Sequence, residues 1–592
     1  MRRQPSPRST RHGLWLCVAA LALGACVASS PDGEDDVGLV PGGKADGSDY
    51  SACELSAVVS QLNGGLGADR LIEAGVHSRA ARNLVERRNG TDGEFGTDDD
   101  RLFETIADVD AVSWVGPVAI QQLVDMVQDR CQAGPTQAEV IMSPQVPDQS
   151  HLARIRDLIN EVPDGGSIDI AIYSFSDRGI SDALASASSR GVRVRFLFED
   201  GGPDSRSPMG STSARLEDMG IEVRYVNKIM HHKFALLSGP REDLGAASTG
   251  VLVTGSGNWS SSAATRYDEN TLIVRGNAEL NLRYQREFNR LWDNSRPVEW
   301  NESIAPIDAI AIDDASIPDD PSVDAVFTSA NFEATISSRY GPTFSGIRNS
   351  NAVSDRWVSL ILGAQRSIRI ASGHLRSRPV AEALIRAHEA NPSLDIRVYL
   401  DGQEYLAEGT HDAQVRDLDA CLEGAGESES RRGNCLDRGF LFSYQVHASG
   451  IALRYKYYAY RWDFSYAPQM HHKYMIIDDS LVVAGSYNLS DNAEHATMEN
   501  DVILEGDAFR SVIDAYIDNF DTLWVTGEAD GLYDSLMDDA RNGEGSLRLV
   551  FEPMALSWDQ VTDLKNALRD ACPDINSTAF RTNPAAHRTC AR

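Results

Sequence analysis

Hydrophobic and polar positions follow a strand–helix–strand order beyond about residue 150. Residues 168–173 and 192–198 have patterns typical of strands, and residues 179–190 between them have a helical pattern. The same order recurs in the second half of the chain, at residues 367–371, 379–390 and 396–400. Alternating strands and helices predict an α/β fold, and their recurrence predicts a domain that is present twice.

The remaining segments have a different character. Residues 301–325 contain seven acidic residues, three prolines and no lysine or arginine, which predicts a linker or a surface crossover. Residues 558–571 form one more helical stretch in a tail for which the sequence suggests no function. Residues 53–131 show helical patterns around an acidic loop, residues 90–100, whose spacing does not fit an EF-hand calcium site.

A short segment of this helical region carries a motif of its own. Residues 106–126, with Val115-Gly116-Pro117, resemble one helix-hairpin-helix unit, a motif that binds the DNA backbone. Trp114 stands where the motif normally has its first glycine. A small helical packing domain is the preferred interpretation of this single, imperfect copy.

The N-terminus has the pattern of an export signal. Arg2 and Arg3 precede an apolar run at residues 14–23, which is too short to span a bilayer permanently. Leu23-Gly24-Ala25-Cys26 resembles the bacterial lipobox, whose cysteine is lipidated. We therefore expect an exported lipoprotein, anchored to the cell envelope through Cys26 or, if the signal is a plain secretory one, secreted.

Together these patterns predict seven regions. In chain order they are a signal peptide (1–25), an acidic flexible tether (26–50), a small helical domain (51–135), a first α/β domain (150–300), a linker (301–330), a second α/β domain (331–526) and a C-terminal extension (527–592).

Export accounts for the cysteines. Without Cys17 in the signal and Cys26 at the lipobox, six remain, and an even number in an oxidising compartment predicts three disulfides. Pairing by proximity in the sequence gives 53–131, 421–435 and 572–590. No C-x-x-C pair or Cys/His cluster indicates zinc.

Composition describes a globular chain that is strongly acidic. Of 592 residues, 42% are hydrophobic, and 87 acidic against 55 basic side chains give a formal charge of −32. Such an excess argues against a broad coat of nucleic acid, because phosphate contacts require Lys and Arg. The charge is uneven, since residues 151–300 hold 18 basic and 20 acidic side chains. The first α/β domain is thus close to neutral and compatible with one phosphate.

The strongest chemical signal is a motif that occurs once in each copy of the α/β pattern. The first copy has Met-His-His-Lys at 230–233, Gly-Ser-Gly-Asn at 255–258 and Glu-Asn at 269–270, and the second has Met-His-His-Lys at 470–473, Gly-Ser-Tyr-Asn at 485–488 and Glu-Asn at 499–500. The Asn and the Glu are eleven residues apart in both copies. Chance does not readily produce two such sets at matching offsets.

The residue types indicate phosphoryl chemistry. On a strand, residues i and i+2 share a face, so His231 and Lys233 point together while His232 points away, and His471 and Lys473 do the same. Lys, Ser and Asn can together hold the non-bridging oxygens of a phosphate, here with Asn258, Asn488, Ser256 and Ser486. A carboxylate can fix the tautomer of a catalytic imidazole, the role expected of Glu269 and Glu499. Two such sets facing each other place one histidine on each side of a phosphorus, as in-line displacement requires.

These motifs resemble the signature of the phospholipase D superfamily, H-x-K-x4-D-x6-G-S-x-N, present twice. The second copy, from His471 to Asn488, matches at every position and includes Asp478. The first copy has Ser238 in place of the Asp and about ten extra residues near 239–250, which we expect to narrow access to the site. The resemblance covers residues 150–525 and implies a duplicated mixed β-sheet flanked by helices, with a pseudo-two-fold axis.

The resemblance also implies a mechanism. One motif histidine attacks phosphorus to form a phosphohistidine, and the other protonates the leaving alcohol and then activates water. By similarity to bacterial members, His231 is expected as the nucleophile and His471 as the acid. Lys233, Lys473, Asn258 and Asn488 stabilise the transition state, and no metal or other cofactor is required. Because both motifs lie in one chain, a monomer is expected to hold the complete site.

The superfamily motifs do not choose the substrate. A phospholipase D-type phosphodiesterase that releases the headgroup of a phospholipid is the preferred function, since both motifs lie in one chain as in the lipases and synthases. Residues 455–466, rich in aromatic and basic side chains, suit a bilayer interface, a choline headgroup or single-stranded bases, or else a strand that faces a core. An extracytoplasmic endonuclease and a non-enzymatic surface lipoprotein are the alternatives.

Overall fold

The computed structural model describes residue 50 and residues 52–591, apart from residues 98, 104, 132–135, 240, 242, 314–316, 340, 437–438, 460–466, 543–545, 549 and 580–588. The predicted signal peptide and lipidated Cys26 lie outside the described residues, as do most of the tether, half of the aromatic stretch and the side chains of Cys53 and Cys131. In the part that is described, every helix is too short or too polar to cross a bilayer.

The first half of the α/β region is built on an eight-stranded mixed sheet. Its three central parallel strands, β2 to β4, are joined on one side by four antiparallel strands and on the other by β9. In spatial order the strands are β1 (Gln137–Ser143), β8 (Glu269–Arg275), β7 (Val251–Gly255), β6 (Lys233–Ser238), β2 (Ser167–Ile172), β3 (Arg193–Phe198), β4 (Glu222–Val226) and β9 (Ser295–Pro297).

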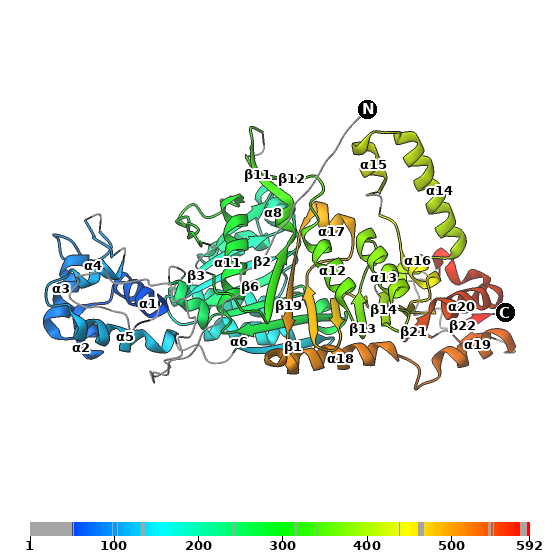
Figure 1. The fold of residues 1–592 in the computed structure, drawn as a ribbon, viewed down its shortest axis with the longest axis horizontal. Coiled ribbons are helices and arrows are strands. Elements are labelled where there is room, and N and C mark those ends of the chain that lie inside the picture. Colours follow the sequence, from blue (N-terminus) through cyan, green and yellow to red (C-terminus); the bar gives the residue numbers. More distant parts are fainter. Residues whose placement is uncertain are drawn as a thin grey trace, which may run out of the picture.

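The second half repeats this sheet strand for strand (Figure 1). Its order is β10 (Val323–Phe327), β19 (Asn500–Glu505), β17 (Leu481–Gly485), β16 (Lys473–Ile477), β13 (Ser367–Ser372), β14 (Asp395–Asp401), β15 (Ala452–Tyr457) and β21 (Met554–Ser557). The predicted α/β fold with a duplicated, mixed sheet is confirmed.

The strands and helices expected from hydrophobic spacing form close to their predicted bounds. The run 168–173 is β2, whose residues are all buried, and 179–190 is α7 (Arg178–Ser189). In the second half, 379–390 is α13 (Arg378–Ala390). Fully buried strands form here because helices cover one face of each sheet and the other half of the molecule covers the other face.

The core of the α/β region has three parts. One lies under the outer helices of the first half and one under those of the second half. The third joins the two sheets through α11 (Ala278–Asp293) and α18 (Arg510–Trp524). The outer helices and short turns of the first half are η1 (Pro147–Gln149), α6 (His151–Glu161), α7, α8 (Gly201–Arg206), α9 (Thr212–Asp218), η2 (Leu244–Ser248) and α10 (Ser261–Thr265). Those of the second half are η4 (Thr328–Asn331), α12 (Ala352–Gly363), α13, η5 (Gly402–Glu404), α16 (Ser443–Ala448), α17 (Asp491–Ala496) and η6 (Asp507–Phe509).

Two short strands connect the halves where the motifs lie. β5 (Ile229–Met230) of the first half pairs in parallel with β18 (Thr497–Met498) of the second, and Asp268 forms the matching bridge with Met470. The pairing places the residues that follow Met230 and Met470 next to strands of the opposite half. The two motif sets therefore meet across a pseudo-two-fold axis.

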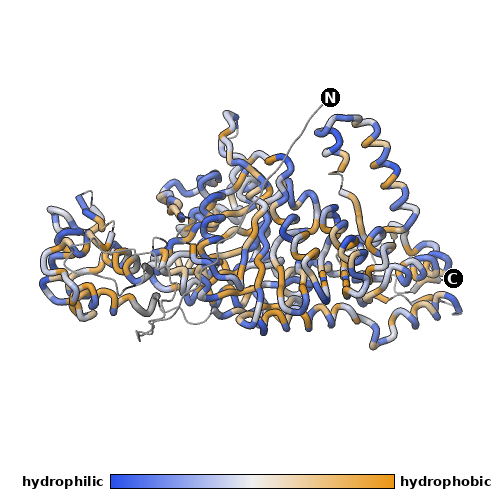
Figure 2. Tube along the Cα trace, in the orientation of Figure 1, coloured by the Kyte–Doolittle hydropathy of each residue, from blue (hydrophilic) through white to orange (hydrophobic). Residues whose placement is uncertain are grey.

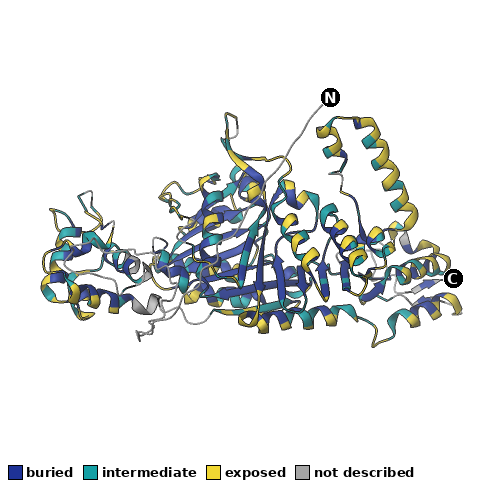
Figure 3. Cartoon of the chain, viewed as in Figure 1, coloured by how far each residue is buried: buried dark blue, intermediate teal, exposed yellow. Residues whose placement is uncertain are grey.

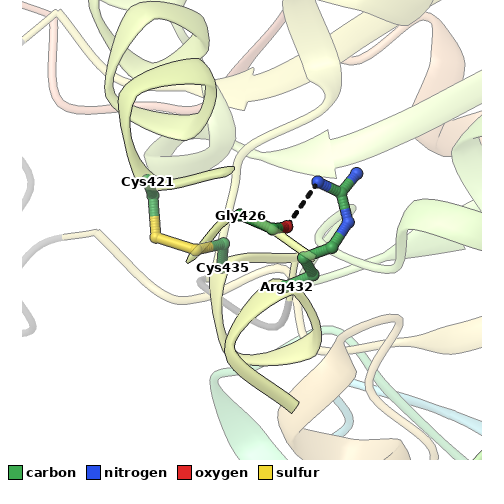
Figure 4. The surroundings of a disulfide bond; sticks show 4 residues. All are labelled: Cys421, Gly426, Arg432 and Cys435. Atoms are coloured by element: carbon green, nitrogen blue, oxygen red, sulfur yellow. Dashed lines mark hydrogen bonds between the residues drawn. A yellow bond between two sulfur atoms is a disulfide. The ribbon is translucent and has the colours of Figure 1, made fainter. Parts of the chain in front are cut away.

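Two projections rise from the same side of the molecule (Figure 1). One is the hairpin of β11 (Phe332–Ser337) and β12 (Gly341–Gly346). The other is an arm of α14 (Glu408–Ala425) and α15 (Glu429–Leu436), whose surface is largely exposed (Figure 3). The predicted disulfide Cys421–Cys435 joins the two helices of the arm, beside a hydrogen bond from Arg432 to the carbonyl of Gly426 (Figure 4).

The tail is partly integrated into the second half. β21, together with α20 (Trp558–Ala571), extends and covers the second sheet, so residues beyond 526 complete this sheet as β9 completes the first. The predicted disulfide Cys572–Cys590 is present, and the remaining elements are α19 (Leu532–Asn542), β20 (Ser546–Arg548), η7 (Pro573–Asn576) and β22 (Thr589–Ala591).

The N-terminal region is a helical domain with its own core, formed by α1 (Ala52–Asn63), α2 (Ala68–Glu73), α3 (Ser78–Arg88), α4 (Ile106–Asp110) and α5 (Pro117–Cys131). Trp114, in the α4–α5 turn, has a positive φ of 72°, the conformation for which a glycine is usual. A second, similar helix pair that we did not predict, α2–α3, turns through Gly75 at φ 100°. Arg79 and His77 of that pair pack on Trp114.

Candidate active site

The motif histidines are held by carboxylates of the opposite half. His231 Nδ1 lies 2.8 Å from Glu499 Oε2, and His471 Nδ1 lies 2.8 Å from Glu269 Oε1. This crossing follows from the strand pairing, because the His231 amide donates to the carbonyl of Met498 and the His471 amide to that of Asp268. Each imidazole thus has its Nδ1 held by a carboxylate, and Lys473 Nζ lies 3.2 Å from the Nε2 of His471.

Burial and charge set the protonation states of these groups. The pKa of His231 is lowered to about 4, mainly by burial and also by Lys233 and Lys473, against the opposing effect of Glu499. The pKa of His471 is lowered in the same way, by burial and by the same two lysines, against Glu269. Although burial alone would raise the pKa of Glu269 and Glu499, their histidine partners keep it below the ordinary value. The resting site therefore pairs two neutral imidazoles with two carboxylates.

The motif lysines lie beside their histidines, at the first position of β6 and β16. Lys233 Nζ donates to the carbonyl of His231 at 2.7 Å, and Lys473 Nζ to that of His471 at 2.8 Å. Each lysine also shifts the pKa of the histidine of the other half, so all four side chains share one site. Burial lowers the pKa of Lys233 to about 7 and that of Lys473 to about 8, which a bound anion would reverse.

Asn258 and Asn488 follow the Gly-Ser turns at the ends of β7 and β17. Among the described residues, the amide oxygen of each is buried without a hydrogen-bond partner. The glycine before each serine is required by close packing, since a Cβ at Gly485 would lie 2.1 Å from the carbonyl oxygen of Asn500. Each asparagine thus brings an amide group with unused hydrogen-bonding capacity to the site.

The motif serines do not face a phosphate as expected. Both are fully buried; Ser486 Oγ donates to Glu499 Oε2 at 2.7 Å, and a hydrogen bond from Ser256 helps to lower the pKa of Glu269. Each hydroxyl also accepts from the amide of the asparagine that follows the glutamate, Asn270 or Asn500. The serines therefore hold the carboxylates that hold the histidines.

The second histidine of each motif points away from the site, as predicted. His232 is buried, with Nδ1 2.9 Å from Asn500 Oδ1 and Nε2 3.2 Å from Glu287. His472 is buried against Tyr474, and its pKa lies well below the ordinary value because of burial.

The position that differs between the two motifs is structural. Asp478 lies at the end of β16 opposite Lys473 and accepts the amides of Gln365, Arg366 and Ser367. Ser238 occupies the matching end of β6 and donates to the carbonyl of Ala246. Neither side chain reaches the motif histidines. The replacement of Asp by Ser therefore concerns local hydrogen bonds at the ends of β6 and β16 rather than the reaction.

The expectation that residues 239–250 narrow access to the site is wrong. These residues follow the end of β6 that lies away from Lys233, and η2 within them contacts α1 and α5 of the N-terminal domain. Asn281 of α11 donates to the carbonyls of Ala247 and Gly250. The extra residues thus form the contact for the helical domain, at the end of β6 opposite Lys233.

Sequence spacing missed several neighbours of the site. Tyr173 packs edge-on against His231, with ring centroids 4.5 Å apart, whereas Gly373 occupies the matching place beside His471. His151 Nε2 lies 3.0 Å from the carbonyl oxygen of Asn258 and supports its turn. A buried ion pair between Lys456 and Asp268, 2.7 Å apart, lies next to His471 only. Since none of these residues recurs in both halves, the repeat that revealed the motifs could not reveal them.

The lysine pKa values predict how activity depends on pH. As the pH rises through about 7 and then about 8, Lys233 and Lys473 lose their protons, and the free enzyme loses the charges that bind a diester. We expect kcat/KM for bis(4-nitrophenyl) phosphate, whose own charge is constant in this range, to fall by about tenfold per pH unit or more above this range. The rate is measured from pH 5 to 10; a constant kcat/KM up to pH 10 would contradict lysines that titrate near neutrality.

Comparison with known proteins places this geometry in a family. The family model described as "Cardiolipin synthase, PLD-like domain" matches residues 155–292 and 357–524, together more than half of the chain. The mitochondrial cardiolipin hydrolase of Xenopus tropicalis is 32% identical over 137 residues, which are 23% of this chain and 59% of that protein. The human mitochondrial cardiolipin hydrolase is 32% identical over 136 residues, 23% of this chain and 48% of that protein.

Among solved structures, similarity extends over more of the chain at lower identity. Nuc of Salmonella typhimurium, a phospholipase D family member, is 18% identical, with a TM-score of 0.22 over 35% of this chain and 95% of its own. Phosphatidylserine synthase of Haemophilus influenzae is 13% identical, with a TM-score of 0.40 over 65% of this chain and 85% of its own. Since the family model matches both halves, the chain belongs to the family described as "Cardiolipin synthase, PLD-like domain" and contains two copies of this domain.

Proposed function

We propose that the protein is a phospholipase D-type phosphodiesterase that hydrolyses phospholipid and releases the headgroup. The observation that carries the proposal is the crossed pair of hydrogen bonds, His231 to Glu499 and His471 to Glu269. It makes one composite site with two imidazoles, two ammonium groups and two amides. These are the groups that attack at phosphorus, protonation of a leaving oxygen and stabilisation of the phosphorane require.

In the proposed first step, His231 Nε2 donates its electron pair to phosphorus, and a P–N bond forms as the P–O bond to the headgroup alcohol breaks. His471, protonated in the reactive complex, gives its Nε2 proton to the departing oxygen. In the second step His471 removes a proton from water, whose oxygen attacks phosphorus as the P–N bond breaks. The products are the alcohol and a phosphate monoester, and Lys233, Lys473 and the two asparagines hold the non-bridging oxygens throughout.

The surroundings of the two histidines support His231 as the nucleophile. Its side chain is 12% exposed and is held between Tyr173 and Glu499, whereas that of His471 is 21% exposed and has Gly373 on the matching side. A nucleophile benefits from a fixed orientation, and a general acid must meet leaving groups of different size. No step of the proposed reaction is assigned to a metal or other cofactor.

The relatives support phospholipid as the substrate class. Those named above are cardiolipin hydrolases, and the family description names cardiolipin synthase. A nuclease is the second candidate, because the two helix pairs α2–α3 and α4–α5 bring Arg79 and the exposed Trp114 together. We also propose export and lipid attachment at Cys26, with one chain sufficient for a complete site.

The substrate is tested by two assays in parallel, both in EDTA. We expect the protein to release the headgroup from cardiolipin or phosphatidylcholine in mixed micelles and to leave supercoiled plasmid intact. A His231→Asn variant is the control for contaminating enzymes. Nicking of plasmid without lipid hydrolysis would favour the nuclease, and inactivity on both substrates and on bis(4-nitrophenyl) phosphate would favour a binding protein.

A further inference from the structure

The two most exposed large hydrophobic side chains of the described residues lie at one end of the first half. Met209 is 87% exposed, in the turn between α8 and α9, and Ile336 is 85% exposed, near the tip of the β11–β12 hairpin. Single exposed aliphatic residues are ordinary on protein surfaces. Their position relative to the active site is what makes these two informative.

The hairpin is attached beside the strand that leads to His231. Thr343 Oγ1 lies 3.1 Å from Asn227 Nδ2, and Lys228 Nζ lies 4.3 Å from the centre of the Phe332 ring. Ile229, also exposed, comes next and lies two residues before His231. On the other side, Thr328 accepts the amide of Glu499 just before the hairpin begins. The base of the hairpin therefore adjoins the segment that leads to His231 and the segment that carries Glu499.

The turn that carries Met209 opens at the same edge of the sheet. This turn follows α8, which comes directly after β3 in the chain. The last residue of β3, Phe198, pairs with Ile172 at the end of β2. The next residue, Glu199, accepts the amide of Met230. Ligands of parallel strands bind outside their carboxyl ends, and here that edge carries the motif residues.

Little within the protein supports the outer part of the hairpin. Of its strand residues, only Phe332 and Phe344 are buried, and the tip projects into solvent (Figures 1 and 3). A two-stranded hairpin alone is marginally stable in water. Figure 2 colours the chain by hydropathy, with hydrophobic positions in orange. An aliphatic side chain at a solvent-exposed tip gains stability when it enters an apolar phase.

The charges around these side chains favour an anionic surface. Within residues 206–211 and 332–348, Arg206, Arg339 and Arg348 are exposed, against one exposed carboxylate, Glu333. This local excess of positive charge is unusual in a chain with a formal charge of −32. Anionic lipid headgroups attract basic residues at a membrane surface.

We propose that Met209, Ile229 and Ile336, the docking rim, seat the protein on a bilayer of anionic phospholipid. The aliphatic side chains enter the interface, the three arginines contact headgroup phosphates, and the site opens toward the lipid. The α14–α15 arm, which projects on the same side of the molecule, carries seven acidic and three basic residues over 408–436 and is not part of the docking rim. This inference rests on the proposed function, since it states that the enzyme reaches its phospholipid substrate in a bilayer.

The test uses the full chain with Cys26→Ser, so that no attached lipid contributes to binding. Met209→Asp, Ile336→Asp and the double variant are compared with Val118→Asp, a 71%-exposed site on the N-terminal domain. Binding is measured by co-sedimentation with vesicles of phosphatidylcholine, with and without phosphatidylglycerol. We expect binding that depends on phosphatidylglycerol, a loss of about tenfold or more in each single variant, and no loss in Val118→Asp.

A soluble substrate separates docking from catalysis. The rim variants should hydrolyse bis(4-nitrophenyl) phosphate at the unaltered rate while losing activity on vesicles. Vesicle binding that is equal in all variants, or absent from the unsubstituted chain, would overturn the docking rim, whatever the lipid assay shows. Rim-dependent binding without hydrolysis of any lipid would retain the rim and refute the proposed function.

Discussion

Replacing His231 or His471 with asparagine should reduce turnover of a phosphodiester by at least about a thousandfold. Removal of one member of a catalytic unit costs nearly as much as removal of the whole unit, because the remaining groups no longer act together. The side chains are polar and of similar size, and each contacts a carboxylate that asparagine can still meet. The loss is therefore expected in kcat at unchanged thermal stability.

The two variants should differ in a single turnover. With bis(4-nitrophenyl) phosphate the leaving group needs no proton, so His471→Asn should release one equivalent of nitrophenolate and then stop. His231→Asn should release none. Exposed His495, whose ring contacts only Asn351 among the bonds described, provides the control as His495→Asn. Full activity in either motif variant would refute the shared mechanism.

Replacing Glu499 or Glu269 with glutamine should lower kcat by about a hundredfold to ten-thousandfold. Both carboxylates are buried, and each accepts from the Nδ1 of a histidine in the other half. An amide at this position leaves the geometry similar but favours the wrong tautomer of the imidazole, which is the effect seen when the aspartate of a serine protease triad becomes asparagine.

A double-mutant cycle tests the crossing itself. If Glu499 acts through His231, then Glu499→Gln added to His231→Asn should cause little further loss, and the same holds for Glu269 with His471. Glu505→Gln, an exposed change at the end of the strand that follows Glu499, should leave kcat unaltered. Independent, additive losses within each crossed pair would show that the glutamates do not act through these histidines.

Much of the fold could be predicted from the sequence because its signals are local and repeated. Buried parallel strands are predominantly apolar, and residues 168–173 and 396–400 are apolar except for Asp169 and Arg397. Two disulfides followed from proximity because 421 and 435 lie in two helices joined by a short turn and 572 and 590 close a short tail. The motif residues were evident because their spacing recurs in both halves.

Features set by contacts between distant residues could not be predicted in this way. His231 and Glu499 are 268 residues apart, and spacing alone does not tell whether a carboxylate serves its own half or the other. The role of Ser486 depends on the buried carboxylate of Glu499 rather than on its neighbours in sequence. The extra residues near 239–250 were placed at the wrong end of β6 because nothing local links them to the helices of the N-terminal domain.

One measurement decides whether the two halves form a single site in which His231 carries the phosphoryl group. His471→Asn is mixed with bis(4-nitrophenyl) phosphate, quenched in alkali, where phosphohistidine survives, and analysed by peptide mass spectrometry. We predict one nitrophenyl phosphoryl group per chain, on His231, and none when His495→Asn is treated in the same way, since His471 remains to complete the reaction. A modification on any other residue, or none at all in His471→Asn, would contradict a phosphohistidine at His231.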